Sequence, residues 1–295
     1  MVAVHTKNRK PLTTATNNPR LKAPEALMDA VELTLLADAA GFYSRPVAFY
    51  LRWGPRFNEH VYIEAPSDLL ERCRRKYLDP AGEHTVRLLI SDPSASRWQG
   101  LYPLMQQRNV LRALGVPIKQ LTLFDRDGLN GEAPEYLTSI GYMISQGHLD
   151  LRPLASGQRN LIAQTGLRLL PDNELDTGST AFHFDLSQRG LHLYYFCRVP
   201  VCPEQLGSVT RVSGPNRNTG RSVAIVNASE ECGDPGWLTH LSIRAAMKLS
   251  ARLLVLAGLP PDRTEEAARA AAKTCNYTGT ILVMVAGRTI KLTDE

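Results

Sequence analysis

The spacing of hydrophobic residues predicts two kinds of segment, strands and helices, which follow each other along the chain. Short runs that alternate apolar with polar positions, or that are rich in β-branched and aromatic residues, are typical of strands. In the second half, turn-forming residues join 180–186 to 191–199 and 208–212 to 222–226, so two β-hairpins are expected. The expected strands are 47–53, 60–64, 85–90, 119–124, 180–186, 191–199, 208–212, 222–226, 280–285 and 289–292.

Apolar residues recur every three or four positions in seven other segments, which predicts helices. The clearest is 237–256, which ends just before Gly258 and Pro260, two residue types that stop a helix. Strands and helices in this mixed order favour an α+β fold with a mixed sheet, β-hairpins and flanking helices. The expected helices are 25–36, 67–77, 98–114, 135–145, 159–169, 237–256 and 264–274.

The chain of 295 residues is long enough to bury a large core in one domain or in two. We expect an α/β region at 25–156 and a hairpin-plus-helix region at 157–295, or one continuous domain at 25–295. No apolar run approaches the roughly 18–20 residues of a membrane span, so no membrane partner is expected. Five scattered cysteines fit a reducing compartment, which predicts a cytoplasmic protein or a component of a virion or ribonucleoprotein particle.

Positive charge is concentrated at the N-terminus, in residues 1–24. This segment contains no Asp or Glu, and its cations are Lys7, Arg9, Lys10, Arg20 and Lys22. The whole chain has 34 Lys and Arg against 29 Asp and Glu, so the rest is neutral overall. Such a polar segment cannot bury enough apolar surface to fold alone. We therefore expect a flexible basic arm that binds an anionic partner.

Two other groups of cations could contact phosphates. The first follows one side of the expected helix 237–256 at intervals of four residues, within about 120° of the helix surface, and contains no acid. The second is the loop 211–221, where arginine could donate paired hydrogen bonds to a phosphate. The residues are His240, Arg244, Lys248 and Arg252 in the ridge, and Arg211, Arg217 and Arg221 in the loop. A solvent-facing helix side and a plain surface loop are the ordinary interpretations.

Two groups of residues suggest catalysis instead. Residues 121–128 form an apolar run followed by Asp125-Arg-Asp127-Gly, which resembles the first motif of haloacid-dehalogenase-type phosphatases. The resemblance implies that Asp125 is a nucleophile and Asp127 a general acid beside a magnesium ion. Elsewhere, His183 and Asp185 are two residues apart on one strand, so they share a face, and His192 can lie across the hairpin. That group could hold a metal ion or transfer protons.

The cationic segments favour a non-catalytic, self-assembling protein that binds nucleic acid, as in viral coats or ribonucleoprotein complexes. Its expected partners are RNA or single-stranded DNA and further copies of itself, and it needs no cofactor or metal. One alternative is an interaction or inhibitor module that docks on an acidic partner. The other is a metal-dependent phosphoesterase or nuclease that uses Asp125 and Asp127, or His183, Asp185 and His192.

Overall fold

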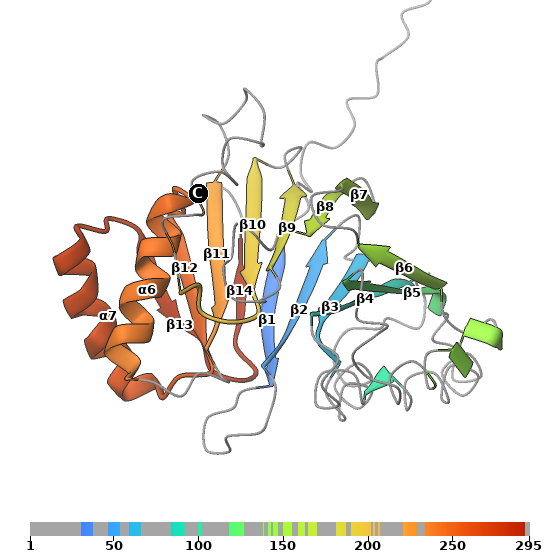
Figure 1. Cartoon of the computed structure of the whole chain (residues 1–295), viewed down its shortest axis with the longest axis horizontal. Coiled ribbons are helices and arrows are strands. Elements are labelled where there is room, and N and C mark those ends of the chain that lie inside the picture. The colour runs from blue at the N-terminus through green and yellow to red at the C-terminus, as the bar shows by residue number, and fades with distance from the viewer. Residues whose placement is uncertain are drawn as a thin grey trace, which may run out of the picture.

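The protein is an α+β structure with two seven-stranded mixed sheets, seen in a computed structural model (Figure 1). The structure describes part of the chain. The described residues are 31–37, 47–53, 59–65, 84–91, 100–101, 118–126, 138, 141–142, 144–146, 150–154, 159–162, 165–169, 181–186, 190–201, 203, 206, 221–228 and 234–292. The predicted basic arm at 1–24 lies outside them.

The first sheet has the strand order β14-β1-β2-β3-β4-β5-β6. Its strands from β14 to β3 pair antiparallel, whereas those from β3 to β6 are parallel. The strands are β1 (Glu32–Ala37), β2 (Ala48–Trp53), β3 (Glu59–Ile63), β4 (His84–Ile90), β5 (Ile118–Arg126), β6 (Asp150–Leu154) and β14 (Thr289–Lys291).

The second sheet has the order β13-β12-β11-β10-β9-β8-β7. Its strands from β10 to β13 are parallel, and those from β7 to β10 pair antiparallel. The strands are β7 (Arg159–Ile162), β8 (Thr165–Leu169), β9 (Ala181–Leu186), β10 (Leu191–Phe196), β11 (Arg221–Asn227), β12 (Leu253–Ala257) and β13 (Thr280–Val283). Two helices, α6 (Pro235–Lys248) and α7 (Pro261–Cys275), lie against it.

The main hydrophobic core lies between the two sheets, because alternate side chains of both sheets point inward. Phe49 of β2 packs edge-on against Tyr195 of β10, with ring centroids 5.7 Å apart, and so joins the sheets. The other face of the second sheet forms a separate core with α6 and α7, through Tyr194, Ala224 and Leu254 among others. Figure 1 shows both helices on this outer side of the second sheet.

Local sequence explains where α6 begins and ends. Asp234 caps the helix by accepting a hydrogen bond from the Trp237 N–H at 3.0 Å, and a proline opens the first turn. The helix ends at Lys248, and Ser250 then adopts a positive φ of 52°. The predicted helix 237–256 is therefore too long. Its last apolar residues form the buried strand β12, since sheet pairing on both sides outweighs their helical spacing.

The structure corrects three other local predictions. The described end of the predicted helix 25–36 lies in strand β1, which pairs with β2 and β14. The predicted helix 159–169 is the antiparallel pair β7 and β8. The strand 222–226 is not part of a hairpin, because β11 pairs parallel with β10 on one side and with β12 on the other.

Most predicted strands are confirmed by the structure. Strands β2, β3, β4 and β5 cover the runs expected in the first half, and β9 and β10 form the expected antiparallel hairpin. The helix expected at 264–274 is α7, and the last two strands are β13 and β14. None of the helices in the described part of the chain is long and apolar enough to cross a membrane.

Candidate active site

Three polar side chains come together on β9 and β10. The antiparallel register places Asp185 opposite His192 and His183 opposite Tyr194. His192 Nδ1 lies 3.4 Å from His183 Nε2 and 3.6 Å from Asp185 Oδ1. The prediction that His183, Asp185 and His192 share one face of a hairpin is therefore confirmed.

This group lies on the outer face of the second sheet, because the intervening residues Phe184 and Leu193 point into the core between the sheets. His183 is only 6% exposed and stacks on Tyr194, with ring centroids 4.5 Å apart and an interplanar angle of 6°. The side chains of His192 and Asp185 keep 19% and 23% of their surface exposed. The inner histidine is thus held by packing, whereas His192 and Asp185 can be reached from solvent.

The geometry suits proton transfer by His192. Both of its polar contacts with described residues use Nδ1. A carboxylate beside Nδ1 favours the tautomer that carries its proton there, and this leaves Nε2 as the basic nitrogen. An imidazole oriented in this way is a general base when a substrate or a water molecule lies at Nε2.

The carboxyl ends of the parallel strands in the first sheet hold a second polar group. Glu64 directly follows β3, is fully buried and has a φ of 67°. Its carboxylate accepts hydrogen bonds from the hydroxyl and the N–H of Ser91, which follows β4. The pairing of Ile90 with Asp125 puts the backbone of Asp125 next along this edge. Asp127 lies outside the described residues.

Ligands of open α/β sheets bind beyond the carboxyl ends of parallel strands, so this edge is a second place to test for catalysis. Glu64, however, already has both of its carboxylate oxygens in hydrogen bonds to Ser91. A buried, non-glycine residue in the left-handed region is costly and persists only when its surroundings hold it. The bonds to Ser91 provide that support.

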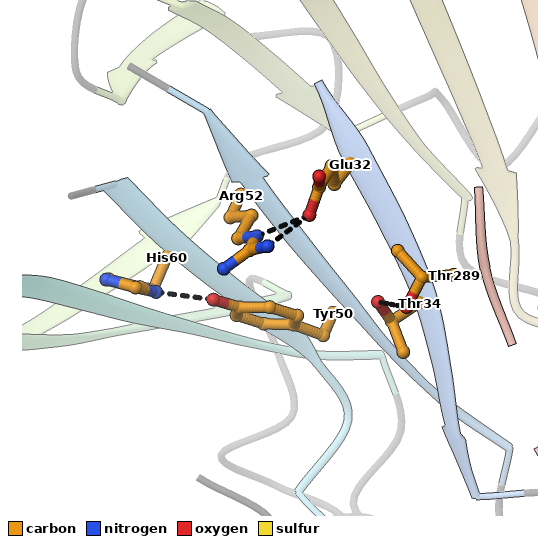
Figure 2. A network of polar contacts seen from close by, with 6 residues as sticks. All are labelled: Glu32, Thr34, Tyr50, Arg52, His60 and Thr289. Atoms are coloured by element: carbon orange, nitrogen blue, oxygen red, sulfur yellow. Dashed lines mark hydrogen bonds and ion pairs between the residues drawn. The ribbon is translucent and has the colours of Figure 1, made fainter. Parts of the chain in front are cut away.

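A third polar group lies on the outer face of the first sheet and was not predicted (Figure 2). Arg52 pairs with Glu32, Tyr50 Oη lies 2.6 Å from His60 Nδ1, and the hydroxyls of Thr34 and Thr289 are 2.8 Å apart. The pairs join β14, β1, β2 and β3. Since each of these side chains already has a partner within the network, we infer that the network stabilises the first sheet.

Of the cations predicted to bind nucleic acid, the described ones lie on α6, just after α6 and at the start of β11. His240 points toward α7, where its Nδ1 lies 3.5 Å from Cys275 Sγ. Arg244 and Lys248 remain on α6, but Arg252 follows the end of that helix. Arg221 is the first residue of β11. The remaining predicted cations, Lys7, Arg9, Lys10, Arg20, Lys22, Arg211 and Arg217, lie outside the described residues.

The described residues contain no group of three or more His, Cys, Asp or Glu side chains that could hold a metal ion. His60 is bonded to Tyr50, His84 is the first residue of β4, and His240 lies in α6. The remaining two placed histidines, His183 and His192, belong to the outer-face group. None of the five is at the carboxyl end of a parallel strand, where the fold would leave room for a bound ion.

Comparison with known proteins identifies the fold. No protein-family model and no curated protein sequence matches the chain. Among solved structures, it is similar to the metallo-beta-lactamase fold protein YhfI from Bacillus subtilis, with a TM-score of 0.60 and 13% identity over 89% of this chain and 100% of that one. At this identity the similarity shows the fold alone.

Two metallo-beta-lactamases are more distant. One has an active-site glutamic acid, with a TM-score of 0.32 and 10% identity over 79% of this chain and 84% of that one. The other, Rm3, has a TM-score of 0.34 and 12% identity over 79% of this chain and 87% of that one. The fold is therefore assigned from the similarity to YhfI.

This comparison contradicts the prediction of a non-catalytic coat-like or ribonucleoprotein-like protein. The similarity covers nearly the whole chain and is to a metallo-beta-lactamase fold. The prediction was wrong because clustered cations report on long-range charge and contain no information about the fold. The resemblance around Asp125 to haloacid-dehalogenase-type phosphatases covers eight residues. The similarity to a metallo-beta-lactamase fold protein gives this resemblance no further support.

Proposed function

We propose that this protein is a hydrolase. The class includes the metal-dependent phosphoesterase or nuclease that the sequence left open as an alternative. The observation that carries the proposal is the position of His192. Its side chain is part-exposed, its Nδ1 contacts Asp185, and its Nε2 has no polar contact with a described residue. Similarity to a metallo-beta-lactamase fold protein supports the same class.

Fold similarity alone is weak support, because one fold hosts many functions. It also implies a metal ion, and the described residues do not fit one. Zinc in proteins is held by three or four nitrogen, sulfur or carboxylate ligands around one point. Glu64 is occupied by Ser91, and the His183, Asp185 and His192 group does not provide such a point. We therefore derive no reaction step through a metal.

The proposed chemistry uses His192 as a general base. Asp185 orients the imidazole through Nδ1, and His183 packs behind it, fixed by its stacking on Tyr194. Nε2 then takes a proton from a nucleophile that attacks an acyl or phosphoryl centre. The imidazolium returns this proton to the leaving group. General acid–base catalysis of this kind contributes about 10²- to 10⁴-fold to a rate.

The test is hydrolysis of p-nitrophenyl acetate, p-nitrophenyl phosphate and bis(p-nitrophenyl) phosphate by the full chain. We expect His192→Gln to lower kcat for the accepted substrate by about 10²-fold or more. His240→Gln is the matched control, because this histidine is also part-exposed but contacts Cys275 instead of a carboxylate. Its activity should equal that of the unmodified protein.

Chelation and Asp125→Asn distinguish the two candidate locations. Activity at the outer face should survive a chelator and Asp125→Asn, and it should depend on His192. Activity that is lost on chelation and in Asp125→Asn, but kept in His192→Gln, would assign the metal-dependent alternative at the carboxyl ends of the first sheet. No hydrolysis of any substrate, with or without added zinc, magnesium or manganese, would contradict the proposal.

A further inference from the structure

Asp185 and His192 are part of a longer row of polar residues that crosses the second sheet. In the register of the sheet, Asp185 on β9 is paired with His192 on β10, and His192 is paired with Ser222 on β11. The backbone N–H of Arg252 donates to the Ser222 carbonyl oxygen at 2.9 Å, so Arg252 lies on the far side of Ser222. A carboxylate on β9, an imidazole on β10, a hydroxyl on β11 and a guanidinium just before β12 therefore follow each other across the sheet.

The paired residues share one face of the sheet. In the next pair along the strands, Leu193 and Val223 point into the core between the sheets, and one pair further on Tyr194 and Ala224 contribute to the core under α6 and α7. Alternation then puts Asp185, His192 and Ser222 on the outer face. Ser222 is part-buried, as are His192 and Asp185, so a small molecule can reach all three.

The order of the groups across the sheet suits nucleophilic catalysis. Nδ1 of His192 is turned toward Asp185 on β9, and Nε2 lies across the ring from that contact. Ser222 is on the strand at the opposite side of β10. A base between an orienting carboxylate and a hydroxyl is the arrangement that activates a serine, and in unliganded structures the bond from base to nucleophile is often long.

We propose that Ser222 is a nucleophile and that Ser222, His192 and Asp185 hydrolyse carboxylic esters through an acyl-enzyme. The inference rests on the proposed function, since it uses His192 as the base. Acyl transfer is favoured over phosphoryl transfer because the latter relies on several positive charges or metal ions around the phosphate. In the described part of the chain, the cations beside Ser222 are Arg252 and Arg221, and strand alternation turns Arg221 away from the outer face.

The reaction has two steps, each balanced by proton transfer through His192. Ser222 Oγ attacks the ester carbonyl, its proton passes to Nε2, and the alcohol leaves with that proton as the carbon–oxygen bond breaks. A water molecule then attacks the acyl-serine ester and gives a proton to Nε2. The carboxylic acid departs, and the proton returns from Nε2 to Ser222 Oγ. Asp185 holds the imidazolium but keeps its charge throughout.

The test is covalent labelling of the full chain by diisopropyl fluorophosphate, followed by mass spectrometry of its peptides. Serine attacks phosphorus, fluoride leaves and the proton goes to His192, so the adduct marks an activated serine. We expect the adduct on Ser222, and at least a 10-fold loss of labelling in His192→Gln. Ser222→Ala should lose labelling, as well as the burst of p-nitrophenol from p-nitrophenyl acetate, by about 100-fold.

Ser145→Ala is the matched control, because within the described residues this exposed serine bonds to the Tyr142 carbonyl and to no histidine. It should label like the unmodified chain. Labelling of another serine, or equal labelling in Ser222→Ala, would overturn the inference. Hydrolysis that depends on His192 but is unchanged in Ser222→Ala would overturn it as well, while the proposed function would stand. Absence of both hydrolysis and labelling in the unmodified protein would overturn both.

Discussion

Replacing Arg52 by methionine tests how the polar network of the first sheet contributes to stability. Arg52 and Glu32 lie opposite each other on β2 and β1, and the guanidinium contacts the Glu32 carboxylate through two nitrogens. The Glu32 side chain is 8% exposed and that of Arg52 is 25% exposed. Arg52→Met keeps most of the side-chain volume but leaves a buried carboxylate without its cation.

The expected loss follows from the burial of Glu32. Removing one partner of a buried ion pair costs about 3–5 kcal/mol, because the remaining charge has lost its solvent and its counter-ion. The exposure of Arg52 lets some water reach the carboxylate, so we expect the lower end, about 3 kcal/mol. The double variant Arg52→Met, Glu32→Leu removes both charges and should stay within about 1 kcal/mol of the unmodified protein.

Urea unfolding followed by circular dichroism measures these differences, provided that the slope of the transition is unchanged. Arg152→Met is the matched control, because Arg152 pairs with Asp150 at 3.0 Å but both side chains are exposed, 56% and 43%. An exposed pair contributes less than about 1 kcal/mol. If Arg52→Met were no more destabilising than Arg152→Met, or if the double variant were the least stable, the reasoning about Glu32 would be refuted.

Three further predictions concern the second sheet. Asp185→Asn should lower kcat about 10²-fold with little change in KM, because an amide no longer favours the Nδ1 proton of His192, and an unchanged kcat would contradict the orienting role. Burial raises the pKa of Tyr277 from 10.0 to about 12. The unfolded chain therefore ionises first, and the urea midpoint should fall as pH rises from 10 to 12, with a smaller fall in Tyr277→Phe. Gly279→Ala should destabilise the protein by about 1–3 kcal/mol in the same urea titration, because the added Cβ would clash with the Tyr277 ring and lie 2.9 Å from the Arg252 carbonyl oxygen. Gly141→Ala is the control: its Cβ meets nothing within 4 Å, so the free energy of unfolding should not change.

Local patterns predicted the alternating strands well, but several other strands were predicted as helices. Alternation is a direct consequence of strand geometry, so β2, β3 and β9 were found within one residue of their ends, and β10 was found from its first residue but predicted three residues too long. Short apolar runs are ambiguous between strand and helix, and both Val31–Leu36 and Leu253–Leu256 were assigned to the wrong state. The division into regions at 25–156 and 157–295 stays a prediction.

The contact between His183, Asp185 and His192 was predictable because a hairpin makes it local. The four-residue connection from β9 to β10 sets the register, and strand alternation then decides which side chains share a face. The cationic segments were equally visible, but their interpretation failed. Charge along the chain does not say which residues converge, and His240 proved to face Cys275 of α7.

Alternation and turn chemistry were enough to predict strands such as β2, β3 and β9 and the acid–base group of the β9–β10 hairpin, since both depend on neighbours within a few residues. Two features arose only from tertiary packing. Parallel pairing needs a crossover whose length hides the partner, so nothing local indicated that Ser222 would lie beside His192. Likewise, Thr34 meets Thr289 across 255 residues because β14 returns to the first sheet, where burial of its apolar neighbours determines the pairing.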